Sequence, residues 1–446
     1  MRELDDICRT ALGFAGADEQ LEVFAEESRH TEVKARNGGA EGLTFSESRG
    51  VGARVVARKR VGFAWAADPD DEEVRQTVAR ARENAALAEP DEFNGLPEAS
   101  TAAPIAELYR GGQAEMALDG KVSLAIDLER RAVSTDPRVK SCDEVVYGDS
   151  VSRIAIASTT GMDSSYERTD AWCVVVALAR DGDETQTGFS YRIGRELAEL
   201  AWEEVADEAV RRGTAMLGAA KPPSAKVPVV LDPFAGSSFL GVLSGALSAE
   251  AVQKGRSLFA DRMGEKIGSD AVTLIDDGRE LAGPAAAPFD DEGVPTGRTE
   301  LMREGTLRGF LHDTYTARRG GTRSTGNASR GGYRTSPGVG TTNFYVEPGS
   351  DPAEKLLAGA SGGILVGEVS GVHSGANPIS GTFSVGATGW RIGPGGERGE
   401  PLREMTIAST IPDMLAAVAA VGDDLRFFSA MGVPTVLIGE MTVAGV

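Results

Sequence analysis

The chain has 446 residues, 41% hydrophobic and 25% charged, which is ordinary for a globular protein and predicts two or three domains. Its formal net charge of −21 repels phosphate backbones and argues against nucleic-acid binding as the main function. The three cysteines are scattered, which argues against a disulfide scaffold. The acidic N-terminus argues against a signal peptide, and no apolar run is long enough to span a membrane. We therefore expect a cytoplasmic protein.

The N-terminal half is predicted to contain the same order of elements twice. In the first predicted domain, 1–105, an opening helix precedes a strand from Leu21, two β-rich runs from Gly50 and Arg60, and a helix over 70–87. In the second, 106–220, a helix over 116–132 precedes strands over 139–147, 152–158 and 172–179 and a long helix over 195–216. Both units run helix, strands, helix, which suggests an internal duplication.

A proline-containing linker over 221–226 leads into the third predicted domain, 221–446. This region contains short strands between glycine, proline and asparagine turns, and two helices are expected, over 237–254 and 411–420. The predicted fold class is therefore α+β, with an N-terminal α/β half, in which a duplication is possible, and a β-dominated C-terminal domain.

Several motifs along the chain share one order with a known family. They are Gly50-Val-Gly-Ala-Arg-Val55, Leu311-His-Asp-Thr-Tyr-Thr-Ala317, Ser324-Thr-Gly-Asn-Ala328 with Arg330, the run from Asn377 to Gly389, and Val421-Gly-Asp-Asp424. No single motif is specific, but the ordered set resembles the TldD/PmbA family over nearly the whole chain. The resemblance implies a C-terminal domain of the TldD/PmbA type and a heterodimer of two homologous subunits, associated with proteolysis of extended peptides and maturation of peptide antibiotics.

In that family the TldD-type subunit holds a metal with a His-Glu-x-x-x-His helix and a distant cysteine, whereas the TldE/PmbA-type subunit lacks these ligands. The corresponding segment here has Gly241, Val242 and Ala246 at the three motif positions, and no cysteine follows Cys173. A hydrolytic zinc needs three protein ligands and a carboxylate near its water. We therefore expect no metal, no other cofactor and no catalytic residue in this chain.

Only a few residues are candidates for ligand binding or for catalysis without a metal. His30 is expected in an exposed loop, and His312, in a strand-like run, is expected to be structural. His373 lies in a glycine-flanked polar loop, the kind of segment that lines ligand clefts. The arginines from Arg318 to Arg330 could capture a peptide carboxylate or form ion pairs with the abundant acids.

The main hypothesis is a non-catalytic, TldE/PmbA-like subunit that pairs with a TldD-type zinc metallopeptidase, or forms a homodimer, and helps to bind an extended peptide or amide substrate. The predicted substrate-binding residues are Thr325, Asn327, Arg330, His373, Ser374 and Asn377. One alternative is a self-sufficient, metal-independent amide-bond hydrolase or transferase that uses His373 with Ser374 or Ser384. Another is a regulatory protein acting on a topoisomerase, as the family's older name, modulator of DNA gyrase, implies.

Overall fold

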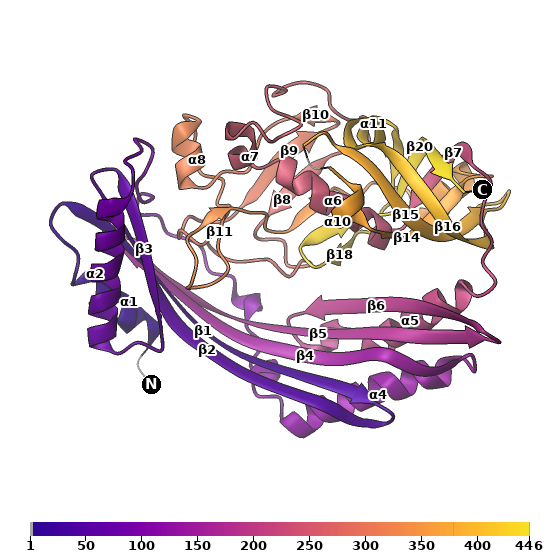
Figure 1. Cartoon of the computed structure of the whole chain (residues 1–446), viewed down its shortest axis with the longest axis horizontal. Helices are drawn as coiled ribbons and strands as arrows, with labels where there is room; N and C mark the ends of the chain where they lie inside the picture. The colour runs from indigo at the N-terminus through magenta and orange to yellow at the C-terminus, as the bar shows by residue number, and fades with distance from the viewer. Residues whose placement is uncertain (1–2, 378, 446) are drawn as a thin grey trace.

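The computed structural model describes residues 3–377 and 379–445. A long, curved antiparallel sheet from the N-terminal half forms one layer, and the β-rich C-terminal half lies over it (Figure 1). This arrangement confirms the predicted α+β class with a β-dominated C-terminal region. None of the helices in the described part is both long and apolar enough to cross a bilayer.

The N-terminal half repeats one order of elements, as the duplication hypothesis predicts. The first repeat consists of α1 (Leu4–Leu12), β1 (Glu19–Arg36), β2 (Gly39–Ala57), β3 (Arg60–Ala67) and α2 (Asp71–Leu87). The second, after η1 (Ala106–Leu108) and α3 (Gly111–Ala114), consists of α4 (Leu118–Thr135), β4 (Val139–Ser158), β5 (Asp163–Asp181), β6 (Glu184–Gly194), η2 (Leu197–Glu199) and α5 (Trp202–Ala215). The six strands form one sheet in the order β3-β2-β1-β4-β5-β6, with β1 antiparallel to β4 at its centre.

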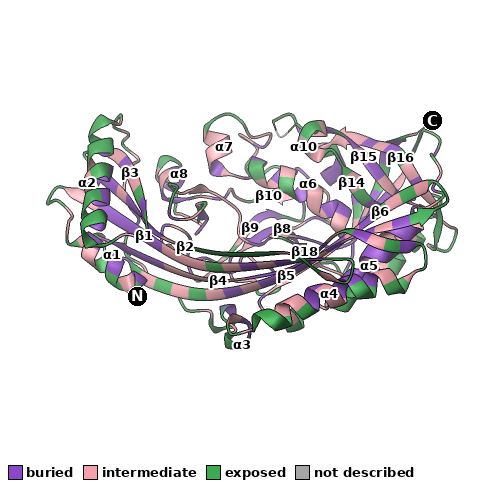
Figure 2. Cartoon of the chain, turned by 60° about the horizontal axis from the view of Figure 1, so that its bottom comes forward, coloured by how far each residue is buried: buried purple, intermediate pink, exposed green. Residues whose placement is uncertain are grey.

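Each repeat uses a glycine to seat its last helix on its edge strand. A Cβ on Gly62 of β3 would lie 2.0 Å from the carbonyl oxygen of Ala81 in α2, and a Cβ on Gly188 of β6 would lie 2.0 Å from that of Ala209 in α5. Both helix backbones thus approach their strands more closely than any side chain permits. The outward faces of α2 and α4 are exposed, whereas their inward faces are buried against the sheet (Figure 2).

Two predicted elements of the second repeat have different bounds. The predicted helix over 195–216 starts at Trp202, because Ala201 has a left-handed backbone with φ of 41° that interrupts it. The predicted strands over 139–147 and 152–158 are one strand, β4. Its polar centre stays in the sheet because Gly148 leaves room for the Trp172 indole and Asp149 bonds Lys121 at 2.7 Å.

The first half of β2 is a free edge of the sheet. β3 pairs only with Gly50–Ala57, so residues 39–49 of β2 pair with β1 alone. This edge carries two large exposed apolar side chains, Leu43 at 51% and Phe45 at 63%. An exposed edge of this kind offers unpaired backbone groups to another chain.

The C-terminal half contains two further sheets around one core. Strands β7 (Ala225–Leu231), β14 (Ile364–Ser370), β15 (Thr382–Ile392), β16 (Arg398–Thr410) and β20 (Val436–Ala444) close into a ring through β16–β20 pairing, and β17 (Val418–Val421) joins β20. The other sheet holds β8 (Leu274–Asp277), β9 (Arg298–Arg303), β10 (Thr306–Leu307), β13 (Phe344–Val346), β18 (Arg426–Phe428) and β19 (Met431–Val433), and β11 (Ala328–Ser329) pairs with β12 (Gly338–Val339).

Apart from α6, the helices described in the C-terminal half have at most 7 residues. They are α6 (Pro233–Ala246), α7 (Ala249–Gln253), α8 (Thr314–Arg319), α9 (Ala353–Gly359), α10 (Val372–Gly375) and α11 (Ile411–Ala416). The predicted helix over 237–254 is therefore two helices. It breaks at Leu247 and Ser248, where Leu311 donates its backbone N–H to the Leu247 oxygen and accepts from Ala249, both at 2.9 Å. The predicted helix over 411–420 ends at Ala416.

The two halves meet where glycines of β2 receive a ring from the C-terminal half. A Cβ on Gly50 would lie 2.2 Å from the Tyr333 ring, and one on Gly52 would lie 2.5 Å from the Tyr333 carbonyl oxygen. Trp65 of β3 adds an edge-to-face contact with Tyr333 at 6.1 Å between ring centroids. The two glycines of the Gly-Val-Gly motif of β2 therefore leave the space in which the C-terminal half packs against the sheet.

Candidate functional site

Helix α6 is the segment that corresponds to the metal-binding helix of the resembled family. It follows β7 directly, because Asp232 caps it by accepting a hydrogen bond from the Phe234 backbone N–H at 2.9 Å, and Pro233 occupies its first position. One face, which includes Phe239 and Leu243, is buried in the core. The opposite face is exposed and made of small residues.

The residues of α6 do not fit a metal. Gly241 is exposed, with no atom within 4 Å of where its Cβ would be, and Gly245 is equally open. Val242 packs partly against the core, and Ala246 is only 1% exposed. None of the three motif positions can donate a lone pair to a metal. Among residues 3–377 and 379–445, no cluster of three His, Cys, Asp or Glu side chains is arranged to hold one.

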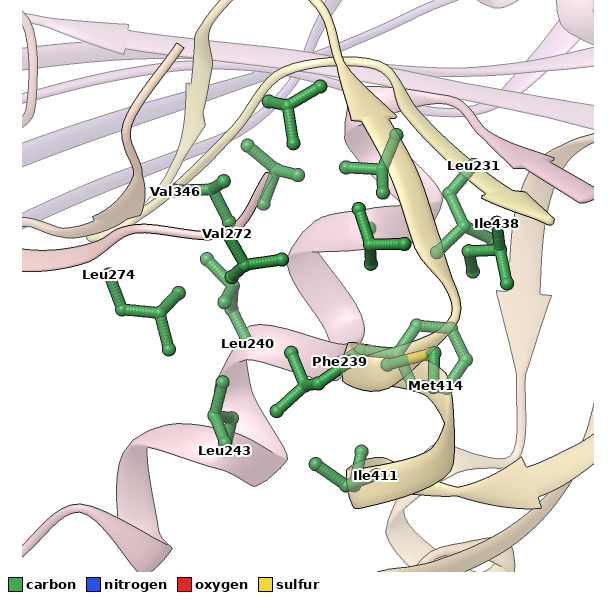
Figure 3. A pocket seen from close by; sticks show the side chains of 16 residues that line it. Leu231, Phe239, Leu240, Leu243, Val272, Leu274, Val346, Ile411, Met414 and Ile438 are labelled. Carbon is green, nitrogen blue, oxygen red and sulfur yellow. The ribbon is translucent and has the colours of Figure 1, made fainter. Parts of the chain in front are cut away.

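A small apolar cavity of about 50 Å³ lies beneath α6 (Figure 3). Figure 3 shows Phe239, Leu240 and Leu243 of α6 facing Ile411 and Met414 of α11 across it. Its lining is almost wholly apolar, so it offers no group for acid–base chemistry and no partners for water. This part of the molecule is core rather than an active site.

The loop that follows β14 carries three of the predicted substrate-binding residues. Ser374, in α10, is exposed, and its hydroxyl donates to the Gly371 oxygen at 3.2 Å. Asn377 is exposed, and its side-chain oxygen accepts from the backbone N–H groups of Ile379 and Ser380 at 2.9 and 3.0 Å. His373 lies in α10, but its side chain is outside what the structure describes.

The other predicted residues, in 324–330, lie elsewhere and are held by internal contacts. Thr325 donates its hydroxyl to the Asn327 side-chain oxygen at 2.7 Å, and the Asn327 amide donates to Asp276 at 2.7 Å. Asn327 is 2% exposed, and burial raises the pKa of Asp276 to about 6 despite bonds from Thr342 and Asn327. Figure 1 shows β11, in this segment, well separated from α10. The structure does not bring the two predicted groups together.

Arg330 belongs to a buried ionic network between the two halves. Its side chain is 1% exposed and bonds Glu22 of β1 at 2.9 Å, while its guanidinium lies 4.4 Å from the centroid of the Phe24 ring. Glu22 also bonds Arg54 of β2 at 2.5 Å, and Arg54 bonds Glu292 at 2.8 Å. These contacts give Arg330 a structural role in joining the halves.

The remaining histidines have structural surroundings. His30 does not lie in an exposed loop, as predicted, but within β1, where it stacks on Trp172 at 5.1 Å between ring centroids. His312 does not lie in a strand but just before α8, and its neighbour Asp313 caps that helix by accepting from the Thr316 N–H at 2.8 Å. Burial lowers the pKa of His312 below its ordinary value, although Thr316 and Asp313 act in the opposite direction.

A cluster of charged residues beside α6 was not predicted from the sequence. Glu208 of α5 accepts bonds from Arg212 at 2.9 Å and from Arg426 of β18 at 3.2 Å. Although burial acts against it, Arg426 and Arg212 lower the pKa of Glu208 to about 2. Local patterns could indicate only the Glu208–Arg212 pair within α5, because Arg426 joins the cluster from β18, far along the sequence.

Comparisons with known proteins agree with this architecture. Three family models match: PmbA/TldA metallopeptidase domain 1 over residues 21–85, the central domain over 112–217 and the C-terminal domain over 224–445. The chain is 28% identical to the metalloprotease PmbA of Escherichia coli O157:H7, an alignment that covers 99% of this chain and 96% of that protein.

Similar relationships hold for other relatives and for solved structures. The metalloprotease PmbA homolog of Haemophilus influenzae is 26% identical, over 98% of this chain and 96% of its own. A crystal structure described as a putative modulator of DNA gyrase from Thermotoga maritima superposes with a TM-score of 0.91 at 27% identity, covering 99% of this chain and all of that one. TldE from Thermococcus kodakarensis superposes with a TM-score of 0.90 at 25% identity, covering 99% of both chains. The chain belongs to the PmbA/TldD family.

Proposed function

We propose that this chain is a non-catalytic, TldE/PmbA-like subunit that pairs with a TldD-type zinc metallopeptidase and completes a cleft for an extended peptide. The observation that carries the proposal is the composition of α6, where Gly241, Val242 and Ala246 stand at the positions of two metal ligands and a catalytic carboxylate. A subunit of this kind would act in cytoplasmic proteolysis or in maturation of peptide natural products, including antibiotics.

Two further features support a role that depends on a partner. The exposed face of α6, with Gly241 and Gly245, allows another backbone to approach closely. The free edge of β2, with exposed Leu43 and Phe45, can accept a strand or an apolar surface from another chain.

The test is co-expression of this chain with a TldD-type subunit from the same genome. The two chains should co-purify, and the mixture should hydrolyse an unstructured peptide that neither chain cleaves alone. Chelation of the metal should abolish this activity, and so should replacement of the glutamate in the partner's His-Glu-x-x-x-His motif by glutamine.

A matched variant of this chain separates substrate binding from catalysis. Ser374→Ala should raise the KM of the pair for the peptide but leave kcat within a factor of about two, since this hydroxyl is proposed to contact the substrate and not to react with it. Peptide hydrolysis by the isolated chain that persists in chelator would contradict the proposal and favour a self-sufficient enzyme.

A further inference from the structure

A cleft of about 620 Å³ lies between α5 and the C-terminal half. Five arginines line it but only two acids, although the whole chain has a formal net charge of −21. Such a local excess of one sign, between protein walls, concentrates anions. The charged residues of the lining are Arg138, Arg211, Arg212, Arg398, Arg426, Glu208 and Asp232.

Both acids of the cleft are already compensated. Glu208 bonds Arg212 and Arg426 at 2.9 and 3.2 Å. Asp232 accepts from the Phe234 N–H at the start of α6 and lies 3.4 Å from Arg212. Two arginines therefore serve to neutralise the acids of the cleft itself, and the others determine its remaining charge.

Two of the remaining arginines are not held by an acid. In the described part of the chain no ion pair involves Arg211 or Arg398. Asp207, the acid whose pKa Arg211 helps to lower, is held in two hydrogen bonds by Arg131, at 2.8 and 2.7 Å. The Arg398 guanidinium lies over the Trp390 ring, 5.0 Å from its centroid, which orients it without neutralising it.

The backbone of β14 is adapted to this Trp390–Arg398 surface. A Cβ on Gly367 would lie 2.6 Å from the Trp390 ring, so only glycine lets the indole lie against the strand. The Gly367 oxygen accepts from Arg212 at 3.2 Å, which joins the two sides of the cleft. The cleft therefore combines a flat aromatic surface with two uncompensated guanidinium groups.

We propose that this cleft binds a small ligand bearing carboxylate groups, of the size of a short acidic peptide, with Arg211 and Arg398 as its anion-binding residues. The planar guanidinium group pairs with a carboxylate through two parallel hydrogen bonds. The neighbouring helix N-terminus, which would favour phosphate, is already occupied by the Asp232 carboxylate. A volume of about 620 Å³ is within the usual range for ligand pockets.

A second hollow extends the cleft along β14. It has a volume of about 150 Å³, shares Arg212, Gly367 and Trp390 with the cleft, and continues past Glu368 to Ser370. Ser370 is the last residue of β14, directly before the loop that carries the predicted residues Ser374 and Asn377. The site is complete within this chain, so the inference goes beyond the proposed function and does not require a partner subunit.

The test is isothermal titration of the isolated full chain with three probes. These are acetyl-Ala-Ala-Ala-Glu, which has two carboxylates, the uncharged acetyl-Ala-Ala-Ala-Gln-amide, and inorganic phosphate. The acidic peptide should bind saturably, and its affinity should fall as ionic strength rises. The uncharged peptide should not bind, and phosphate should bind more weakly than the acidic peptide.

Single-residue variants locate the site. Arg398→Gln and Arg211→Gln should each weaken binding of the acidic peptide about tenfold, because each removes a charge-assisted hydrogen bond. Both side chains are exposed, so circular dichroism and thermal unfolding should match the unsubstituted chain. The control, Arg308→Gln, removes an exposed arginine outside the cleft and should bind normally. Absence of saturable binding, equal binding by the cleft variants, or tighter binding of phosphate would overturn the proposal.

Discussion

Replacement of Glu22 by glutamine tests whether the buried ionic network joins the two halves of the molecule. Glu22 is 1% exposed and bonds both Arg330 and Arg54, at 2.9 and 2.5 Å. Arg54 keeps Glu292 as a second partner, but Glu22 is the only acid in an ion pair with Arg330 in the described chain. Glu22→Gln keeps the volume and removes the one ion-pair partner that Arg330 has among the described residues, although Asp291 still interacts electrostatically with its guanidinium. Breaking a buried pair in this way costs about 3–5 kcal/mol in free energy of unfolding.

The measurement is equilibrium unfolding in urea, followed by circular dichroism and by tryptophan fluorescence. The matched control is Glu144→Gln, on β4 of the same sheet. Glu144 forms an ion pair with Lys34 in which the Lys34 side chain is 45% exposed and the Glu144 side chain is 44% exposed. Such an exposed pair should contribute less than about 1 kcal/mol to the free energy of unfolding. The double variant Glu22→Gln with Arg330→Met removes both charges and should be more stable than the sum of the two single losses predicts. A loss for Glu22→Gln no larger than for Glu144→Gln would refute the reasoning.

Three further predictions concern the fold, pH and α6. Gly62→Ala should lower the free energy of unfolding by about 3 kcal/mol in the same urea assay, because the new Cβ would lie 2.0 Å from the carbonyl oxygen of Ala81 in α2. The control Gly42→Ala should be neutral, because no atom lies nearer than 3.8 Å to its new Cβ. The pKa of Asp276 in the folded protein, about 6, lies above its usual value of 3.8, so the native state binds the proton more tightly than the unfolded chain does. The contribution of Asp276 to the free energy of unfolding should therefore decrease as pH rises from about 4 to 6, by roughly 3 kcal/mol at most. Asp276→Asn should remove that part of the pH dependence of urea unfolding, and an unchanged profile would count against it. Ala246→His should lower the melting temperature in differential scanning calorimetry, because Ala246 is 1% exposed and a histidine does not fit there. Gly241→His, on the open face of α6, should leave the melting temperature unchanged. Equal shifts for the two variants would be inconsistent with the burial described.

Local signals predicted the elements whose bounds depend on neighbouring residues. The helix predicted over 70–87 is α2, Asp71–Leu87, because the Asp70 side chain caps it by accepting from the Glu73 N–H at 2.8 Å. The helix predicted over 237–254 failed at Leu247 because the strand pairing that ends α6 comes from Leu311, far along the sequence. Such contacts leave no local pattern.

The candidate site was predictable to the same limited extent. Gly371 and the polar residues after it indicated an exposed loop, and Ser374 and Asn377 are exposed there. Their role in substrate binding stays a prediction. The arginine cleft was not predicted, because its lining residues range from Arg138 to Arg426 and only the fold brings them together. The ordered set of motifs indicated the family, and one of its glycines, Gly50, lies where the two halves of the molecule meet.

The seam at the centre of the sheet has a consequence for how the chain can be divided. Strands β1 and β4 pair continuously from Glu22 with Ser158 to Lys34 with Val146, although they belong to different repeats. The covalent link between the repeats passes through the segment 88–105, which contains no helix or strand. A backbone cut there would leave every strand pair of the seam intact, so the two fragments should associate when produced together. The pairing of β1 with β4 thus does not depend on the covalent link between the two repeats.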